Sequence, residues 1–161
     1  MTVVGKLAQT IIPFGSVAWR SHLVNACVGT LAVTAVYNTL LLIGKNSSAG
    51  RRIPAAAFAA MAVAFAPNHW QHSIHANPHL ITATFLIVNV WLLLRWQDGF
   101  EQGNHRPLLF FSLLTGLGAV HHPLTVFSFL AYAAFILVVY PAIFKDWKLL
   151  LKMVGLSLIH I

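Results

Sequence analysis

Acidic residues are almost absent from this sequence. Only three of its 161 residues are Asp or Glu, whereas ten are Lys or Arg. The three acids, Asp98, Glu101 and Asp146, all lie in the second half, so residues 1–97 contain no carboxylate side chain. A mechanism that needs two neighbouring carboxylates as general acid and general base therefore has no candidate pair in the first half.

Charged residues of any kind make up only 8% of the chain, and cysteine occurs once, at Cys27. A single cysteine excludes a disulfide within the chain, and its apolar neighbours predict a buried, inert thiol. Hydrophobic residues reach 58% and occur in long blocks, which is too apolar for a soluble domain of this length. The net charge of +7 does not indicate nucleic-acid binding, because no basic patch with interleaved aromatic residues occurs.

The apolar blocks predict an all-α fold, a polytopic bundle of transmembrane helices. Short polar gaps separate blocks that approach the roughly twenty residues needed to cross a bilayer. Pro13 and Gly15 interrupt the apolar stretch before the first block. The five predicted spans, followed by the start of a sixth near Leu149, are residues 24–43, 53–66, 80–96, 107–120 and 124–144.

The positions of Lys and Arg predict the orientation of this bundle. Eight of the ten fall in or beside alternate gaps, at residues 44–52, 97–106 and 145–152. Gaps rich in Lys and Arg face the cytoplasm. The acids lie on the same predicted side, whereas residues 69–82 and His121-His122-Pro123 fall on the luminal or periplasmic side. No carboxylate is therefore expected to face those histidines.

Residues 69–82 form a polar segment between apolar blocks, which we call the histidine island. It contains His69, His72, His75 and His79. If the chain is helical up to Ala76, the first three share one broad face. The sequence Asn77-Pro78 predicts a new helix start, because Asn caps free amides and Pro fits the first helical position.

Several residues on the predicted luminal side are candidates for binding an anionic ligand. Arg20 has the fork of donors that matches a lipid phosphate, and the alternative is an interfacial anchor beside Trp19. His72, His121 and His122 could donate hydrogen bonds to a phosphate or an acceptor, or be hydrated loop residues. Trp70 suits a sugar platform or an aromatic belt.

Metal or haem binding is a second hypothesis for the same histidines. Imidazole is the commonest metal ligand, and His69, His72, His75 and His79, together with His121 and His122, would be the ligands. No cysteine or carboxylate assists them on that side, and Pro78 disrupts their spacing. We therefore predict no bound metal. An inactive structural fragment is a third hypothesis.

Short motifs in order resemble a family of multi-pass membrane glycosyltransferases. That family includes the endoplasmic-reticulum protein O-mannosyltransferases of plexin-type receptors and uncharacterised bacterial relatives. The resemblance covers residues 2–144. Trp70 to Ala76 resembles its Trp-x-x-x-x-x-Ala-Glu motif. The other matching motifs are Gly5-Lys6-Leu7, Pro13-Phe14-Gly15-Ser16, Arg20, Asn25, Ser47-Ser48-Ala49-Gly50, and Gly116-Leu117-Gly118-Ala119 with His121-His122.

The resemblance implies a GT-C-type architecture and chemistry on the non-cytoplasmic face. Its partners would be membrane lipid, a polyprenyl-phosphate sugar donor as co-substrate and a protein acceptor, with no cofactor and no nucleic acid. The location would be the endoplasmic reticulum in a eukaryote or the inner membrane in a bacterium.

Two departures from the family pattern bear on activity. Asn77 stands where the family has Glu, and the family's upstream acidic loop would lie before Met1. We therefore expect residues 1–155 to be a fragment of one integral-membrane domain, truncated at both ends and inactive alone, with no catalytic residue of its own. Residues 156–161 resemble a translated sequencing adaptor and are expected to lie outside that domain.

Overall fold

The structure, a computed structural model, describes residue 6 and residues 9–75 and 77–159. All regular secondary structure in these ranges is helical, as predicted. The chain forms two compact units, Met1–Ile87 and Val88–Ile161, and α5 begins in the first and ends in the second. The elements are α2 (Val17–Ile43), α3 (Ala49–Ala64), α4 (Pro67–Ser73), α5 (Pro78–Asp98), α6 (Arg106–His121), η1 (Pro123–Ser128), α7 (Phe129–Val139), η2 (Ile143–Lys145) and α8 (Trp147–Leu158).

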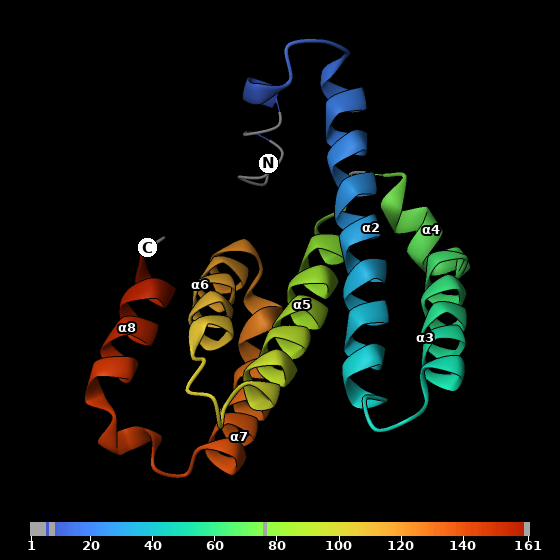
Figure 1. Ribbon diagram of the computed structural model, residues 1–161. Coiled ribbons are helices and arrows are strands. Elements are labelled where there is room, and N and C mark those ends of the chain that lie inside the picture. The colour runs from blue at the N-terminus through green and yellow to red at the C-terminus, as the bar shows by residue number, and fades with distance from the viewer. Residues whose placement is uncertain (1–5, 7–8, 76, 160–161) are drawn as a thin grey trace. The chain divides into compact units, whose positions relative to one another are not determined.

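The first unit is built on α2 and α3, which lie side by side and run in opposite directions (Figure 1). Ser16 begins α2 because its side chain accepts a hydrogen bond from the backbone N–H of Trp19 at 3.2 Å. Small buried residues let the backbones of the helices approach closely. The small buried residues are Ala32, Ala35 and Thr39 in α2, and Ala56 and Ala60 in α3.

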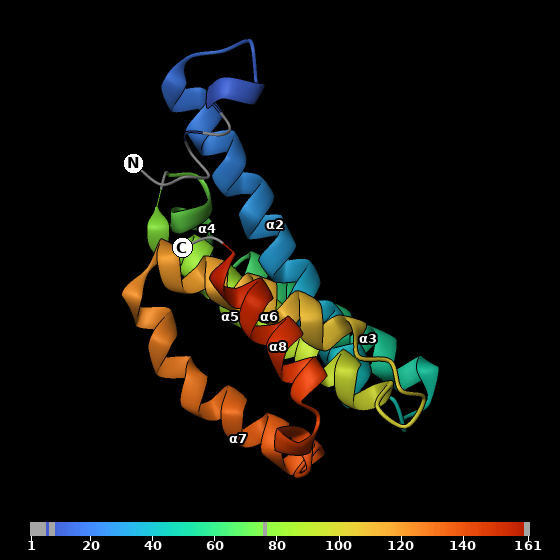
Figure 2. The ribbon, with the colours of Figure 1, turned by 90° about the vertical axis from the view of Figure 1, so that its left-hand side faces the viewer.

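The second unit includes α6 and α8, which run side by side in both views (Figures 1 and 2). Their backbones approach closely at Gly116, where an added Cβ would lie 2.1 Å from the backbone oxygen of Ser157. Trp96 is fully buried, and its indole N–H donates to Nδ1 of His105 at 3.1 Å. This bond connects the end of α5 to the residue that precedes α6.

The prediction of one continuous helix over residues 124–144 is wrong. The segment is divided into η1, the 11-residue α7 and η2. Side chains of Thr125 and Ser128 donate to backbone carbonyls three residues earlier, at 2.8 and 2.6 Å, within the 3₁₀ turns. Pro141 ends α7 because the residue before a proline is driven out of the helical region, and Tyr140 has φ −135° and ψ 78°.

Within the described part of the chain, two helices are long and apolar enough to cross a membrane, α2 with 27 residues and α5 with 21. They correspond to the predicted spans 24–43 and 80–96. The helices at the other predicted spans are shorter, with 16 residues in α3 and in α6 and 12 in α8. A bundle of about five spans is thus not confirmed by helix length among the described residues.

Candidate functional site

The histidine island begins inside a short helix. Pro67 occupies the first turn of α4, where its missing N–H removes no hydrogen bond, and the helix ends at Ser73. His69 and His72 are helical, whereas His75 lies beyond the helix end, so the three histidines do not share one helical face; Ala76 is outside the described residues. In the last turn of this seven-residue helix, the carbonyl of His72 accepts a hydrogen bond from a side chain of α2 instead of from a further helical turn.

That side chain is Asn25, one of the most buried polar residues of the first unit. Its amide nitrogen donates to the backbone carbonyl of His72 at 3.3 Å and also to that of His75. The carbonyls at a helix C-terminus have no partner within their own helix, and burial without a partner costs free energy. Asn25, which lies 47 residues before His72 in the sequence, therefore caps the C-terminal end of α4 and fixes the island against α2.

Gly29 lies one turn after Asn25 on the same side of α2. A Cβ added there would lie 2.5 Å from Oγ and 3.1 Å from Cβ of Ser73, and 3.5 Å from Nε2 of His69. The Ser73 hydroxyl donates to the carbonyl of His69 at 2.8 Å. Only a residue without a side chain therefore allows α4 to approach α2 this closely.

Asn77 organises the other end of the island. Its Oδ1 accepts the backbone N–H of His79 at 2.8 Å, which confirms the predicted cap, and Pro78 is the first residue of α5 as predicted. The hydrogen bond to His79 fixes the orientation of the Asn77 amide, whose nitrogen faces Nδ1 of His72 at 2.7 Å. The amide donates, so Nδ1 accepts and the ring proton of neutral His72 is on Nε2. His72 is thereby fixed as a hydrogen-bond donor through Nε2.

His22 is a neighbour of the island that the sequence interpretation missed. It is exposed on α2, and its ring centroid lies 6.1 Å from that of His75 in an edge-on arrangement. The only sequence signal was spacing: His22, Asn25 and Gly29 follow one another at helical intervals on one side of α2.

No group of three or more His, Cys, Asp or Glu residues suited to a metal ion occurs in the described ranges. Of the four island histidines among the six proposed ligands, His69 and His72 are half-buried in α4, whereas His75 and His79 are exposed. His72 Nδ1 already accepts from Asn77, which leaves one ring nitrogen for any other partner.

Arg20 holds the turn that precedes α2. Its Nε donates to the carbonyls of Phe14 and Gly15 at 3.0 and 3.1 Å, and its Nη1 donates to that of Gln9 at 2.8 Å. Gly15 has φ +80°, a conformation that favours glycine, and an added Cβ would meet the ring of Trp19 at 2.5 Å. These bonds give Arg20 a structural role, and phosphate binding by its remaining donors stays a prediction.

The other predicted residues are Trp70, His121, His122 and Cys27. Trp70 is in α4 with 58% of its surface exposed. His121 and His122 belong to the second unit, where His121 ends α6 and Nδ1 of His122 accepts the backbone N–H of Leu124 at 3.2 Å. Cys27 is exposed, so the prediction of a buried thiol is wrong. It is two residues from Asn25 and Gly29, which places it on the opposite side of α2.

The arrangement in the first unit is therefore a short histidine-bearing helix held on α2 by Asn25 and Gly29, with His72 oriented by Asn77. No solved structure matches this chain. Residues 1–149 match the family described as the protein O-mannosyl-transferase TMEM260 N-terminal domain. Because this match extends over nearly the whole sequence, the chain belongs to that protein O-mannosyltransferase family.

Proposed function

We propose that this chain is part of a multi-pass, GT-C-type membrane glycosyltransferase. It would transfer a sugar, mannose by the family's name, from a polyprenyl-phosphate donor to a hydroxyl group of a protein acceptor. The family match over residues 1–149 is the observation that carries this proposal. Two helices with the length and apolar composition of membrane spans agree with it.

The chemistry of the island suits the donor's phosphate. When the sugar leaves, negative charge grows on the phosphate oxygens, and fixed hydrogen-bond donors stabilise it. Nε2–H of His72 is such a donor, and its direction is set by Asn77. Residues 1–97 contain no carboxylate that would repel the anion. Trp70, exposed on the same helix, is placed to contact a sugar or the membrane interface.

The base that accepts the proton of the acceptor hydroxyl is not supplied by Asn77. An amide does not act as a general base, and both ends of this one are engaged, with His79 and with His72. We therefore assign donor binding to this chain and no part in proton transfer to Asn77. The distribution of Lys and Arg supports placing the island on the luminal or periplasmic side.

Donor binding can be tested separately from transfer. The purified chain in lipid nanodiscs is irradiated with dolichyl-phosphate mannose that carries a photoreactive group in its prenyl chain. Loss of one charge-assisted hydrogen bond in His72→Ala is expected to reduce cross-linking roughly tenfold. Gln71→Ala, at the exposed neighbouring position of α4, should cross-link like the wild type. Equal yields from all three proteins would contradict the proposal.

Cys27 provides a direct test of whether α2 crosses the membrane. It is the only thiol, it is exposed, and it lies well inside a 27-residue apolar helix. If the exposed side of α2 faces lipid, a charged methanethiosulfonate should reach Cys27 slowly, because charged reagents enter hydrocarbon poorly. The labelling rate of Cys27 in liposomes should then be at least about tenfold lower than after unfolding in SDS. Ser48→Cys in a Cys27→Ser background, in the exposed turn before α3, should react rapidly. Equally rapid labelling of Cys27 in liposomes would exclude a spanning α2.

A further inference from the structure

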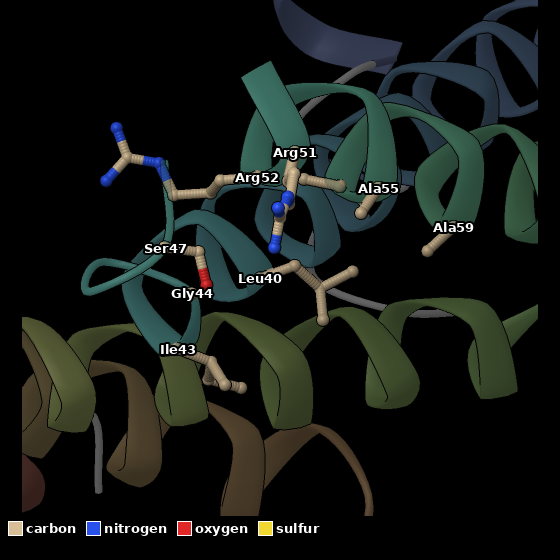
Figure 3. A pocket seen from close by; sticks show the side chains of 9 residues that line it. Leu40, Ile43, Gly44, Ser47, Arg51, Arg52, Ala55 and Ala59 are labelled. Atoms are coloured by element: carbon tan, nitrogen blue, oxygen red, sulfur yellow. The ribbon is translucent and has the colours of Figure 1, made fainter. Parts of the chain in front are cut away.

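The turn between α2 and α3 forms one end of a pocket of about 290 Å³ (Figure 3). The pocket lies within the first unit, at the opposite end of α2 from His22 and Asn25. Its lining combines apolar side chains from both helices with two arginines. The residues that matter here are Leu40, Ile43, Ala55, Ala59, Arg51 and Arg52.

The positive charge at this pocket lies in a unit whose sequence contains no Asp or Glu. Arg51 and Arg52 are adjacent in the first turn of α3, and Lys45 lies in the turn before them. No Asp or Glu occurs before Asp98. Clustered cations without carboxylates nearby attract an anion from outside the chain.

The guanidinium group of Arg52 is not fully hydrogen-bonded. Its Nη1 donates to the backbone carbonyl of Lys45 at 3.3 Å, and its aliphatic stem lies against Gly44, where an added Cβ would be 3.2 Å from Cγ. Its Nε is buried and has no hydrogen-bond partner among the described residues. A buried guanidinium donor without an acceptor is unfavourable, and phosphate oxygens match its paired donors.

We infer that this pocket binds the phosphate of an anionic phospholipid. Arg51 and Arg52 contact the phosphate oxygens, and Leu40, Ile43, Ala55 and Ala59 contact the first methylenes of the acyl chains. The apolar lining favours a lipid over a free phosphate ion. The position also fits, since the pocket lies where the long apolar helix α2 ends, at Ile43. The inference concerns a site separate from the island and does not depend on glycosyl transfer.

Native mass spectrometry of the detergent-purified chain tests this site. Dioleoyl phosphatidic acid is the probe, dioleoyl phosphatidylcholine has the same acyl chains without net charge, and glycerol 3-phosphate has the phosphate without acyl chains. We expect phosphatidic acid to bind at least about tenfold more tightly than either. The double variant Arg51→Gln/Arg52→Gln should lose this preference. The matched control Arg106→Gln removes one exposed arginine from the second unit and should retain it.

A second variant tests the pocket without changing charge. Ala59→Phe fills the apolar part and should weaken phosphatidic acid binding about tenfold while leaving both arginines in place. Circular dichroism and gel filtration establish that each variant is folded. Unchanged binding in the folded double variant or in Ala59→Phe would overturn the inference. Equal affinity for phosphatidylcholine would exclude charge recognition, and equal affinity for glycerol 3-phosphate would exclude a lipid.

Discussion

Replacement of Asn25 by aspartate is expected to detach the histidine island from α2. The two side chains have nearly the same shape, but the amide nitrogen that donates to the carbonyls of His72 and His75 becomes a carboxylate oxygen. Two hydrogen bonds are lost, and a buried negative charge then faces two carbonyl oxygens. Each unsatisfied buried group costs about 1–3 kcal/mol, so we expect the docked state to lose at least about 3 kcal/mol.

Ser73 reports this detachment because it is half-buried against Gly29. In a Cys27→Ser/Ser73→Cys background, a water-soluble maleimide labels the thiol only when the island opens. A loss of about 3 kcal/mol raises the open population, and hence the labelling rate, by on the order of a hundredfold.

Asn38→Asp is the matched control for Asn25→Asp. It makes the same substitution in the same helix, at an amide that donates only within α2, to the carbonyl of Thr34 at 2.9 Å. Labelling of the Ser73→Cys thiol should remain near the parent rate. A similar acceleration in both variants would show that a charge anywhere in α2 loosens the unit, and that Asn25 has no particular role.

Local sequence signals predicted the parts of this site that depend on local interactions. The cap made by Asn77 and the helix that begins at Pro78 follow from chemistry within two residues, and both are confirmed. The helical character of the apolar blocks was also predictable, because it depends on composition and period. The length of α4 was not, since its end is determined by Asn25, which lies 47 residues before His72.

Exposure was harder to predict than helix position. An apolar neighbourhood predicted a buried Cys27, yet this side of α2 is exposed. In a soluble protein the apolar side of a helix faces the core, but small residues form the contacts between membrane helices and larger apolar ones face lipid. Asn25 and Gly29, the polar and the small residue of this stretch, are the ones that make contact. A search of the α2 sequence for small and polar residues would have identified the side of the helix that contacts α4.

Replacement of Gly29 by leucine is expected to separate α4 from α2 by steric exclusion. An added Cβ alone would lie 2.5 Å from Oγ and 3.1 Å from Cβ of Ser73, and the rest of a leucine side chain has no space between the two helices. Forcing extra carbons into a packed contact costs about 1–3 kcal/mol, so we expect about 3 kcal/mol for Gly29→Leu and less for Gly29→Ala. Unfolding in SDS, followed by circular dichroism, measures these losses.

Two further variants assign the loss in Gly29→Leu to this contact. Ala26→Leu enlarges an exposed residue of the same helix three positions earlier and should change the unfolding free energy by less than about 0.5 kcal/mol. Ser73→Gly removes the two atoms nearest to the new Cβ and leaves only His69 Nε2, at an ordinary 3.5 Å. It should therefore reduce the loss of stability caused by Gly29→Ala, although it weakens α4 by about 1 kcal/mol on its own. We expect a favourable coupling energy of roughly 1 kcal/mol between the two substitutions. Strict additivity of Gly29→Ala and Ser73→Gly would mean that the helices do not meet at these residues, and Asn25 would then be the remaining anchor of the island on α2.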